Sequence, residues 1–311
     1  MSSDDARIRV SVIMANYNGA AHIAAAVRSV LEQRECALEL ILSDDGSNDD
    51  SMTIAKEAAL GDARLVLLQS ETRGGPAAAR NRALMNARGD WIAIVDNDDF
   101  IEPDRLARLI ALAEADRANI AADNLISFYD DAPGASHLHL PPQYRREPLW
   151  IDATEFVNAD NRRAGLGYLK PLFRRAAFGN ALRYDENLSI GEDTQLMMQL
   201  LSGGARLRLY PDAGYHYRRR RGSISHRQNL AALDAMIAAI DHIDPRGDAA
   251  LAAALARRKK ALTNARAYDE IVTALKARDP AEAVKRALMR PAALARFRHP
   301  IAARLGLQRR T

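Results

Sequence analysis

The stretch Trp91-Ile-Ala-Ile-Val-Asp96-Asn-Asp-Asp99 joins five apolar residues to a cluster of three carboxylates. Short apolar runs are typical of strands buried in parallel sheets, and open parallel sheets bind ligands beyond the carboxyl ends of their strands. Carboxylates this close repel one another unless a cation lies among them, and Mg²⁺ or Mn²⁺ binds carboxylates together with phosphate oxygens. The stretch therefore predicts a strand that ends at a divalent-cation site. A solvated acidic loop before a helix that begins near Pro103 is the alternative.

The chain up to residue 128 alternates similar apolar runs with helical patterns. The apolar runs cover residues 10–15, 38–43, 64–68, 91–95 and 120–128. The helical patterns cover residues 22–33, 51–60, 76–87 and 103–115. Strands that alternate with helices of about ten or more residues are typical of a parallel sheet with helices on both faces. We therefore predict an α/β fold with a Rossmann-like, mostly parallel sheet.

The remaining sequence divides into two parts. Proline and glycine between residues 130 and 148 predict a loop. Short elements follow, with helices expected near residues 154–158 and 192–202 and strands near 168–173 and 205–210. From Gln228 onward the pattern is helical. We expect one domain over residues 1–226, with halves at 1–128 and 129–226, and a helical C-terminal extension over 227–311.

Charge is unevenly distributed along the 311 residues. The formal net charge is +4, yet residues 283–311 hold eight Lys or Arg and no acid, so the rest of the chain carries a net charge of −4. Nucleic-acid binding predicts aromatic residues interleaved with basic ones, whereas aromatic residues make up only 5% of the chain and the tail holds only Phe297. The composition therefore disfavours a nucleic-acid partner. The basic tail predicts either contact with anionic lipid or a solvated C-terminus.

Other features limit the class of protein. Apolar residues make up 48% of the chain, enough for a buried core. Cys36 is the single cysteine, which excludes an intrachain disulfide and a cysteine metal cluster. The sequence contains no run of 18 apolar residues, so we expect no membrane-spanning helix. Asp4 and Asp5 lie where a signal peptide would carry positive charge, so we expect no signal peptide. We expect a cytoplasmic location.

Three further segments lie near predicted strand ends. Residues 15–19 (Ala-Asn-Tyr-Asn-Gly) offer amides and a stacking face, and are neither a G-x-G-x-x-G loop nor a Walker loop. Residues 42–49 contain Asp-Asp-Gly-Ser, which predicts either a simple turn or a carboxylate that holds a base or ribose. Residues 73–81 place two glycines before a helix; Arg73 could bind phosphate, and Arg80 and Asn81 could instead hold the acidic loops.

Taken in order, these four segments resemble the family 2 glycosyltransferases of the GT-A fold. The matching residues are Asn16 and Asn18, Asp-Asp-Gly-Ser-Asn-Asp at 44–49, Gly75 with Ala-Arg-Asn at 79–81, and Asp-Asn-Asp-Asp at 96–99. Four ordered motifs are more specific than any one alone, and the match covers residues 8–128. Arg73 departs from the pattern, because many members carry Asn there. Residues 165–173, 182–185, 191–193, 215–218 and 222–225 are similar to the bacterial exopolysaccharide branch, especially the succinoglycan-type glucosyltransferases.

The resemblance implies a role for each matching residue. Asp193 corresponds to the catalytic base; an acidic helix N-terminus is the alternative interpretation, and the two are compatible. Mn²⁺ or Mg²⁺ would be bound by Asp98 and Asp96, with His216 or His226 as a further ligand. A hydrogen-bonded polar side chain without a metal is the alternative for this histidine. The nucleotide sugar would contact Ala15, Asn16, Tyr17, Asn18, Asp45, Arg73, Arg80, Asp96 and Asn97. The acceptor or sugar side would include Lys170, Glu192 and Arg218.

The resemblance therefore implies an inverting, metal-dependent transferase. The expected donor is a nucleotide-diphosphate sugar, UDP-glucose in particular, and the expected acceptor is a polyprenyl-diphosphate-linked glycan at the cytoplasmic face of a membrane. A catalytically inactive sugar-nucleotide-binding scaffold is the alternative, although it predicts loss of Asp98 or Asp193, and both are present. A nucleotidyltransferase would need a basic, glycine-rich first loop, which residues 15–19 do not provide.

Overall fold

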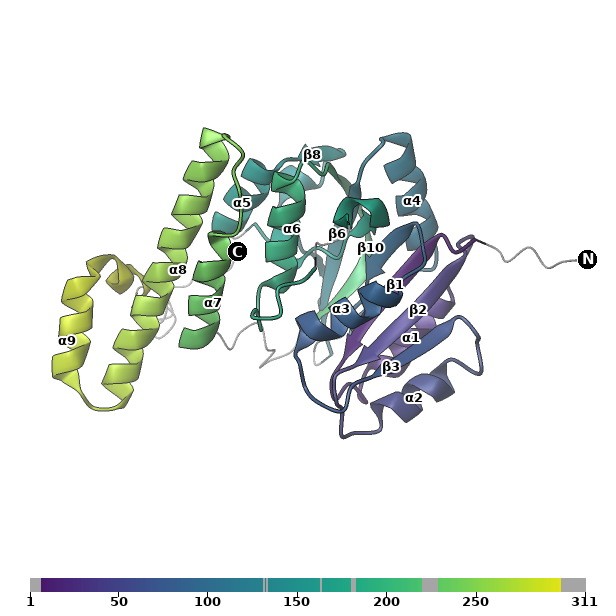
Figure 1. Ribbon diagram of the computed structural model, residues 1–311, viewed down its shortest axis with the longest axis horizontal. Helices are drawn as coiled ribbons and strands as arrows, with labels where there is room; N and C mark the ends of the chain where they lie inside the picture. The colour runs from purple at the N-terminus through teal and green to yellow at the C-terminus, as the bar shows by residue number, and fades with distance from the viewer. Residues whose placement is uncertain are drawn as a thin grey trace, which may run out of the picture. The chain divides into compact units, whose positions relative to one another are not determined.

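The computed structural model describes residues 7–130, 132, 134–162, 164–179, 183–219 and 229–297. The chain divides into two compact units, residues 1–223 and residues 224–311 (Figure 1). The first unit contains the sheet and the second is helical. The two units are described separately below.

The first unit is built on one sheet (Figure 1). Its main path runs β3-β2-β1-β4-β9-β6-β10-β5. The strands are β1 (Val10–Asn16), β2 (Leu38–Asp44), β3 (Leu65–Gln69), β4 (Trp91–Ile94), β5 (Phe100–Ile101), β6 (Ile120–Tyr129), β7 (His137–Leu138), β8 (Leu149–Ile151), β9 (Leu172–Arg174) and β10 (Leu207–Arg219). The long pairings, β1 with β2 and β6 with β10, are parallel. The antiparallel pairings, such as β9 with β4 and β6, are short. The sheet is therefore mostly parallel, which confirms the predicted α/β class.

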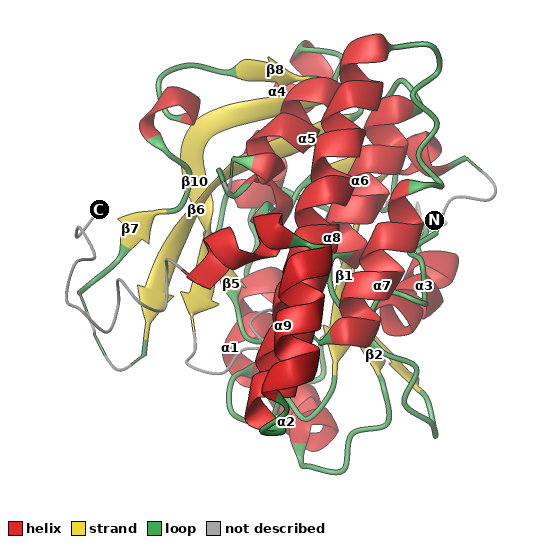
Figure 2. Ribbon diagram, turned by 90° about the vertical axis from the view of Figure 1, so that its left-hand side faces the viewer, coloured by secondary structure: helices red, strands yellow, loops and turns green. Residues whose placement is uncertain are grey.

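Helices cover both faces of this sheet. They are α1 (Ile23–Leu31), α2 (Ser51–Ala58), α3 (Pro76–Asn86), α4 (Arg105–Ala115), α5 (Ala153–Asn161) and α6 (Glu192–Ser202). The chain runs outward from β1 to β2 and β3, then returns to β4 on the other side of β1. Right-handed crossovers therefore place α1 and α3 on opposite sides of β1 (Figure 2). The strand order reverses between β1 and β4, and sheets of this kind bind ligands at that point.

The centre of the sheet is buried on both faces, which explains why its strands read as continuous apolar runs. Val12, Ile13, Ile41, Trp91 and Ile92 are all 0% exposed. Burial of each such side chain stabilises the fold by about 1.5–3 kcal/mol. These strands are therefore fixed in register, and the polar residues that follow them are held in defined positions.

Some second-half elements differ from those expected. The sequence predicts one strand over residues 168–173, but Leu166–Tyr168 form a 3-10 turn, η2, and β9 covers only Leu172–Arg174. The left-handed Gly165 (φ 82°) starts that turn, and Pro171 has no N–H to donate to a strand ladder. The expected loop at 130–148 contains β7 and a second 3-10 turn, η1 (Pro142–Tyr144). A third 3-10 turn, η3 (Arg175–Phe178), follows β9.

Strand β10 continues to Arg219, well past the predicted end at residue 210. Its pairing with β6 shifts register between Tyr210 and Ala213 and again between Ala213 and Tyr215. Pro211 and Gly214 lie at these shifts, and such residues mark strand irregularities. Because these residues interrupt the strand pattern, the sequence does not indicate the C-terminal part of β10.

The second unit consists of α7 (Leu230–Ile240), α8 (Ala249–Lys276), α9 (Pro280–Met289) and the 3-10 segment η5 (Pro291–Phe297). Both α7 and α9 pack against α8. Small residues allow close packing: Ala267, Ile271, Ala274, Ala283 and Ala293 form a buried cluster. The helical pattern predicted from Gln228 is observed up to residue 297, and the end of the basic tail lies outside the described residues.

None of the helices in the described ranges is both long enough and apolar enough to cross a bilayer.

Candidate active site

The acidic loop after β4 brings three carboxylates together. One oxygen from each of Asp96, Asp98 and Asp99 lies within 4.8 Å of the others. Asp99 is buried and fixed: its Oδ2 accepts from the Tyr215 hydroxyl at 2.8 Å and its Oδ1 from the Arg218 backbone N–H at 2.7 Å. The loop therefore has a defined shape, set from β10.

The charges of this loop fit a divalent cation. Burial raises the pKa of Asp99 well above its usual range, and the nearby charges of Asp98 and Asp96 raise it further. Such like-charge repulsion is what a bound cation relieves. Three carboxylate oxygens are also the donor type that Mn²⁺ or Mg²⁺ prefers. The loop residues thus fit the predicted metal.

Two cations connect this loop to Asp193. Lys170 Nζ lies 2.8 Å from Asp96 Oδ2 and 2.9 Å from Asp193 Oδ2. Arg80 lies 2.9 Å from Asp96 Oδ1 and 3.4 Å from Asp193 Oδ1. Both cations are buried, so the attraction is little screened by solvent. Asp193, from the second half of the domain, is therefore held beside the acidic loop of the first half.

The environment of Asp193 keeps its carboxylate ionised. Burial by itself would raise the pKa of Asp193, but Arg80 and Lys170 outweigh burial and the pKa is lowered. The side chain lies in the first turn of α6, after Gly191, whose left-handed backbone (φ 85°) starts the helix. A helix N-terminus also favours a negative charge. Asp193 is thus ionised at neutral pH.

Glu192, the neighbour of Asp193, has a different environment. Its Oε1 accepts from Arg80 at 2.5 Å. Burial and then the charge of Asp193 raise the pKa of Glu192, while Arg80 opposes both. The Arg80 guanidinium therefore forms ion pairs within the protein, with Asp96, Glu192 and Asp193. This geometry matches the expectation that Arg80 holds acidic groups, and Asn81 similarly binds the backbone of Tyr184.

The end of β1 lies against the acidic loop. Asn16 is buried; it donates to Asp44 Oδ1 at 2.7 Å and accepts from Asn97 Nδ2 at 2.6 Å. Ala15 is the preceding residue of the same strand. The Asn18 backbone N–H donates to Ser47 Oγ at 2.9 Å. Asn16 and Asn97 therefore tie β1, β2 and the acidic loop together.

Asp45 and Arg73 lie in the neighbouring loops. Asp45 is buried and accepts from the backbone N–H groups of Gly74 and Gly75 at 2.9 and 2.7 Å. The Arg73 guanidinium lies 4.1 Å from the centre of the Tyr17 ring. Tyr17 is itself 38% exposed, so this pair presents a cation and an aromatic face at the surface of the sheet edge.

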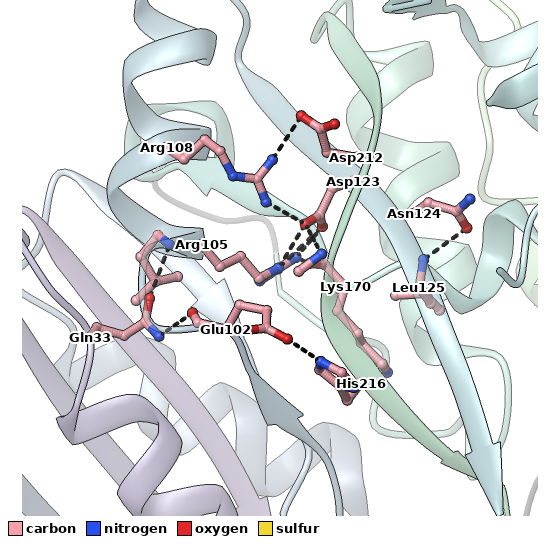
Figure 3. Close-up of polar contacts among 12 residues, drawn as sticks. Gln33, Glu102, Arg105, Arg108, Asp123, Asn124, Leu125, Lys170, Asp212 and His216 are labelled. Atoms are coloured by element: carbon pink, nitrogen blue, oxygen red, sulfur yellow. Dashed lines mark hydrogen bonds and ion pairs between the residues drawn. The ribbon is translucent and has the colours of Figure 1, made fainter. Parts of the chain in front are cut away.

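The structure places His216 outside the acidic cluster. Its Nε2 lies 2.5 Å from Glu102 Oε1 (Figure 3), and its ring stacks on Phe100 at 4.3 Å between centroids. Among the described residues, only Asp96, Asp98 and Asp99 form a group able to hold a metal. The alternative ligand His226 lies outside the described residues.

Arg218 reaches the acidic loop through its backbone and side chain. Besides the contact to Asp99, its Nε donates to the Asp98 carbonyl at 2.6 Å, and its guanidinium pairs with Asp130. Arg219 is described, whereas Arg220 and Arg221 are not. Arg218 therefore supports the loop rather than lying free for an acceptor.

Two buried features that support these residues were not predicted from the sequence. Arg105 of α4 and Asp123 of β6 are both fully buried and pair at 2.7 Å (Figure 3). Arg105 also donates to the Lys170 carbonyl at 2.6 Å. Tyr215 lies in a segment that the sequence singled out, but it was not expected to join β10 to the loop after β4, where its hydroxyl accepts from the Asp96 N–H and donates to Asp99. A buried charge gives no local pattern in a sequence, and only the sheet topology reveals these contacts.

A mostly parallel sheet with an acidic loop at its switch point and a further carboxylate beside it is the arrangement expected of a glycosyltransferase of the GT-A fold. The sequence profile of Glycosyl transferase family 2 matches residues 11–178. The chain is also 38% identical to the succinoglycan biosynthesis protein ExoO of Rhizobium meliloti (strain 1021) over 304 residues, covering 95% of this chain and 86% of ExoO. The chain therefore belongs to glycosyltransferase family 2.

Solved structures with low identity share the fold. TarS of S. aureus, crystallised with UDP-GlcNAc, superposes with a TM-score of 0.66 at 18% identity and covers 89% of each chain. The mannosyltransferase PcManGT of Pyrobaculum calidifontis, in complex with GDP-Man and Mn²⁺, gives a TM-score of 0.60 at 17% identity, covering 98% of this chain and 82% of that one. Both likenesses concern the fold alone.

Proposed function

We propose that this glycosyltransferase transfers glucose from UDP-glucose, with inversion, to a polyprenyl-diphosphate-linked oligosaccharide in the biosynthesis of an exopolysaccharide. The observation that carries the proposal is the position of Asp193, which Lys170 and Arg80 hold beside the acidic loop. A base next to a site for a diphosphate is what a single displacement at the anomeric carbon requires. The similarity to ExoO supports a role in exopolysaccharide synthesis.

The proposed reaction is one in-line displacement. The acceptor hydroxyl oxygen forms a bond to the anomeric carbon as the bond from that carbon to the diphosphate oxygen breaks, and the nucleoside diphosphate leaves. Asp193 takes the hydroxyl proton, for which its oxygen must lie within about 2.6–3.2 Å of the hydroxyl in the complex. One attack from the face opposite the leaving group inverts the anomeric configuration.

The acidic loop would hold the cation on the donor side. Asp96, Asp98 and Asp99 are the residues that fit Mn²⁺ or Mg²⁺. When bound, the ion would neutralise the charge that develops on the departing diphosphate. Asp96 and Asp99 already accept hydrogen bonds from this chain, but an ionised carboxylate has about four lone-pair positions and can accept more partners.

The nucleoside would lie over the ends of β1 and β2. In this proposal Tyr17 and Arg73 provide a stacking face and a cation, and Asn18 and Asp45 face the base and ribose. Asn16 and Asn97 are bound to each other, so their role is to fix the floor of the site.

Contact with an anionic membrane is a further part of the proposal. Helix α9 exposes Val284, Leu288 and Met289, which are 58%, 77% and 70% exposed, next to the basic Lys285 and Arg286. Apolar and basic side chains side by side are typical of helices that lie on anionic lipid. Such contact would keep the enzyme near a lipid-linked acceptor.

A donor panel tests the reaction. The purified chain is mixed with UDP- and GDP-sugars, Mn²⁺ and a polyprenyl-diphosphate-linked oligosaccharide as acceptor, and release of nucleoside diphosphate and the thermal shift are measured. We expect UDP-glucose to be the preferred donor. Excess EDTA should abolish release, and full activity in EDTA would overturn the role of the metal.

Variants of two carboxylates test the base. Asp193→Asn should lose nearly all turnover while it still binds UDP, and Asp212→Asn serves as the control because Asp212 is an exposed carboxylate of the same unit. Near wild-type turnover of Asp193→Asn would refute the assignment. UDP binding without release from any donor, in the wild type, would favour the scaffold interpretation.

A further inference from the structure

A cluster of three aromatic rings lies beside the candidate active site. Tyr168 of η2, His139 and Tyr217 of β10 pack in a triangle, with ring centroids 5.2 Å (His139–Tyr168), 6.1 Å (His139–Tyr217) and 6.0 Å (Tyr168–Tyr217) apart. They come from three separate parts of the chain, so the fold assembles them. None of them has a role in the proposed chemistry.

The cluster is next to Asp193 and the acidic loop. Tyr168 is two residues before Lys170, whose Nζ lies between Asp96 and Asp193. Tyr217 directly precedes Arg218, which binds Asp98 and Asp99. Gly167, Leu169 and Lys170 also line one cavity together with Asp193. Burial raises the pKa of Tyr217 to about 12, and the charges of Lys170, Asp96 and Asp99 act on its hydroxyl. The cluster therefore lies near the same charged groups.

Close packing fixes the turn that carries Tyr168. A Cβ on Gly165 would lie 2.7 Å from His139 Nε2, and a Cβ on Gly167 would lie 2.7 Å from Thr194 Oγ1. Thr194 follows Asp193 in α6, so glycine at both positions lets the turn approach the aromatic cluster on one side and the base on the other. Tyr168 is thus held at a set position relative to Asp193.

Tyr168 nevertheless stays accessible. Its side chain is 41% exposed, although it belongs to a packed cluster. Burial lowers the pKa of His139 to about 4, and the charges of Arg219, His137 and Arg145 act in the same direction. At neutral pH the cluster is therefore an uncharged aromatic surface at the rim of a charged site.

We propose that Tyr168, supported by His139 and Tyr217, is the platform on which a pyranose ring of the acceptor stacks. One face of a pyranose carries C–H bonds with partial positive charge, and an aromatic face carries partial negative charge. Stacking would place a ring hydroxyl toward Asp193 while the charged groups stay clear of the apolar face. This inference rests on the proposed function, because it names the substrate class on the acceptor side of that site.

Binding of a soluble sugar tests the platform. Cellobiose is the probe, and sorbitol is the acyclic comparison because it has hydroxyls but no ring face. Saturation-transfer NMR and titration are carried out on the UDP-saturated protein with its full chain. We expect transfer to the ring C–H protons of cellobiose and none to sorbitol.

Three variants sharpen the test. Tyr168→Ala should weaken cellobiose binding about tenfold and leave UDP binding unchanged, whereas Tyr168→Phe should bind like the wild type. Trp150→Ala is the matched control, since Trp150 is 43% exposed and its ring is covered by Arg206 and Arg208. Cellobiose binding that Tyr168→Ala leaves intact, or that the wild type lacks, would overturn the proposal.

Two outcomes separate this inference from the proposed function. Weaker UDP binding in Tyr168→Ala, with no change for cellobiose, would show that the ring serves the nucleobase and would refute the acceptor platform. Cellobiose binding that depends on Tyr168, in a protein that releases no nucleoside diphosphate from any donor, would uphold the platform and refute the proposed reaction.

Discussion

The buried pair of Arg105 and Asp123 offers the sharpest test of what holds the active site together. Both side chains are 0% exposed, and Arg105 donates to Asp123 Oδ1 from Nη2 at 2.7 Å and from Nε at 3.1 Å. Asp123 Oδ2 also accepts from the Gly214 N–H at 3.0 Å. Figure 3 shows how this pair joins α4, β6 and β10 behind Lys170.

Replacing Asp123 with Asn keeps the shape but removes the charge. The Arg105 guanidinium then remains buried, with the Lys170 carbonyl as its other hydrogen-bond partner. Removing one partner of a buried ion pair typically costs about 3–5 kcal/mol. Since domains are stable by about 5–15 kcal/mol in total, Asp123→Asn should lose a large part of the stability of the first unit.

Urea unfolding followed by tryptophan fluorescence measures the loss. Trp91 and Trp150, the two tryptophans of the chain, both belong to the first unit. With a slope of about 1–3 kcal/mol per molar urea, the midpoint should fall by about 1 M or more. Asp212→Asn, which removes an exposed partner of Arg108, should cost at most about 1 kcal/mol.

A double variant separates charge from packing. Arg105→Met combined with Asp123→Leu should recover most of the loss, because apolar replacement of a whole buried pair is often neutral. If Asp123→Asn unfolds at the same urea concentration as Asp212→Asn, the pair contributes nothing measurable and the reasoning fails.

Two further predictions concern pH and lipid. Since the pKa of His139 is about 4 in the folded chain against an ordinary value of 6.5, the contribution of His139 to stability should be constant above about pH 6.5 and fall by about 2–3 kcal/mol by pH 4.5. His139→Gln should remove this part of the fall in urea unfolding, and an identical difference between pH 6.5 and pH 4.5 in both proteins would contradict the assignment. Replacing Leu288 and Met289 together with Asp should reduce co-sedimentation with anionic vesicles and leave UDP affinity unaltered, while equal sedimentation of both proteins would end the membrane proposal.

The donor half was predictable because its signals are local. Strands buried on both faces read as apolar runs, and β1, β2 and β4 are such strands. The acids follow these strands directly, so the sequence alone places Asp45 and Asp96 at one sheet edge. Helix α6 begins at Glu192, as its acidic first turn predicts.

The second half was less predictable because its signals are long-range. Strand β10 pairs with β6 through two register shifts, and no sequence period survives them. Tyr215 contacts Asp99 across 116 positions of the chain, and Asn81 contacts the backbone of Tyr184 across 103. Which polar residues meet depends on the order of the strands in the sheet, and local sequence patterns do not encode that order.

The site therefore depends on groups shared between the two halves. Asp96 and Asp193 carry like charges, and Arg80 and Lys170 neutralise both together. Removal of either cation would leave Asp96 and Asp193 with a single shared cation, and the pKa of at least one of the two carboxylates would rise. A protonated carboxyl group cannot take up a further proton as a base. Lys170 and Arg80 thus keep both Asp96, on the donor side, and Asp193, the proposed base, ionised. Replacement of either cation should therefore reduce donor binding and turnover together. Replacement of Asp193 should reduce turnover alone.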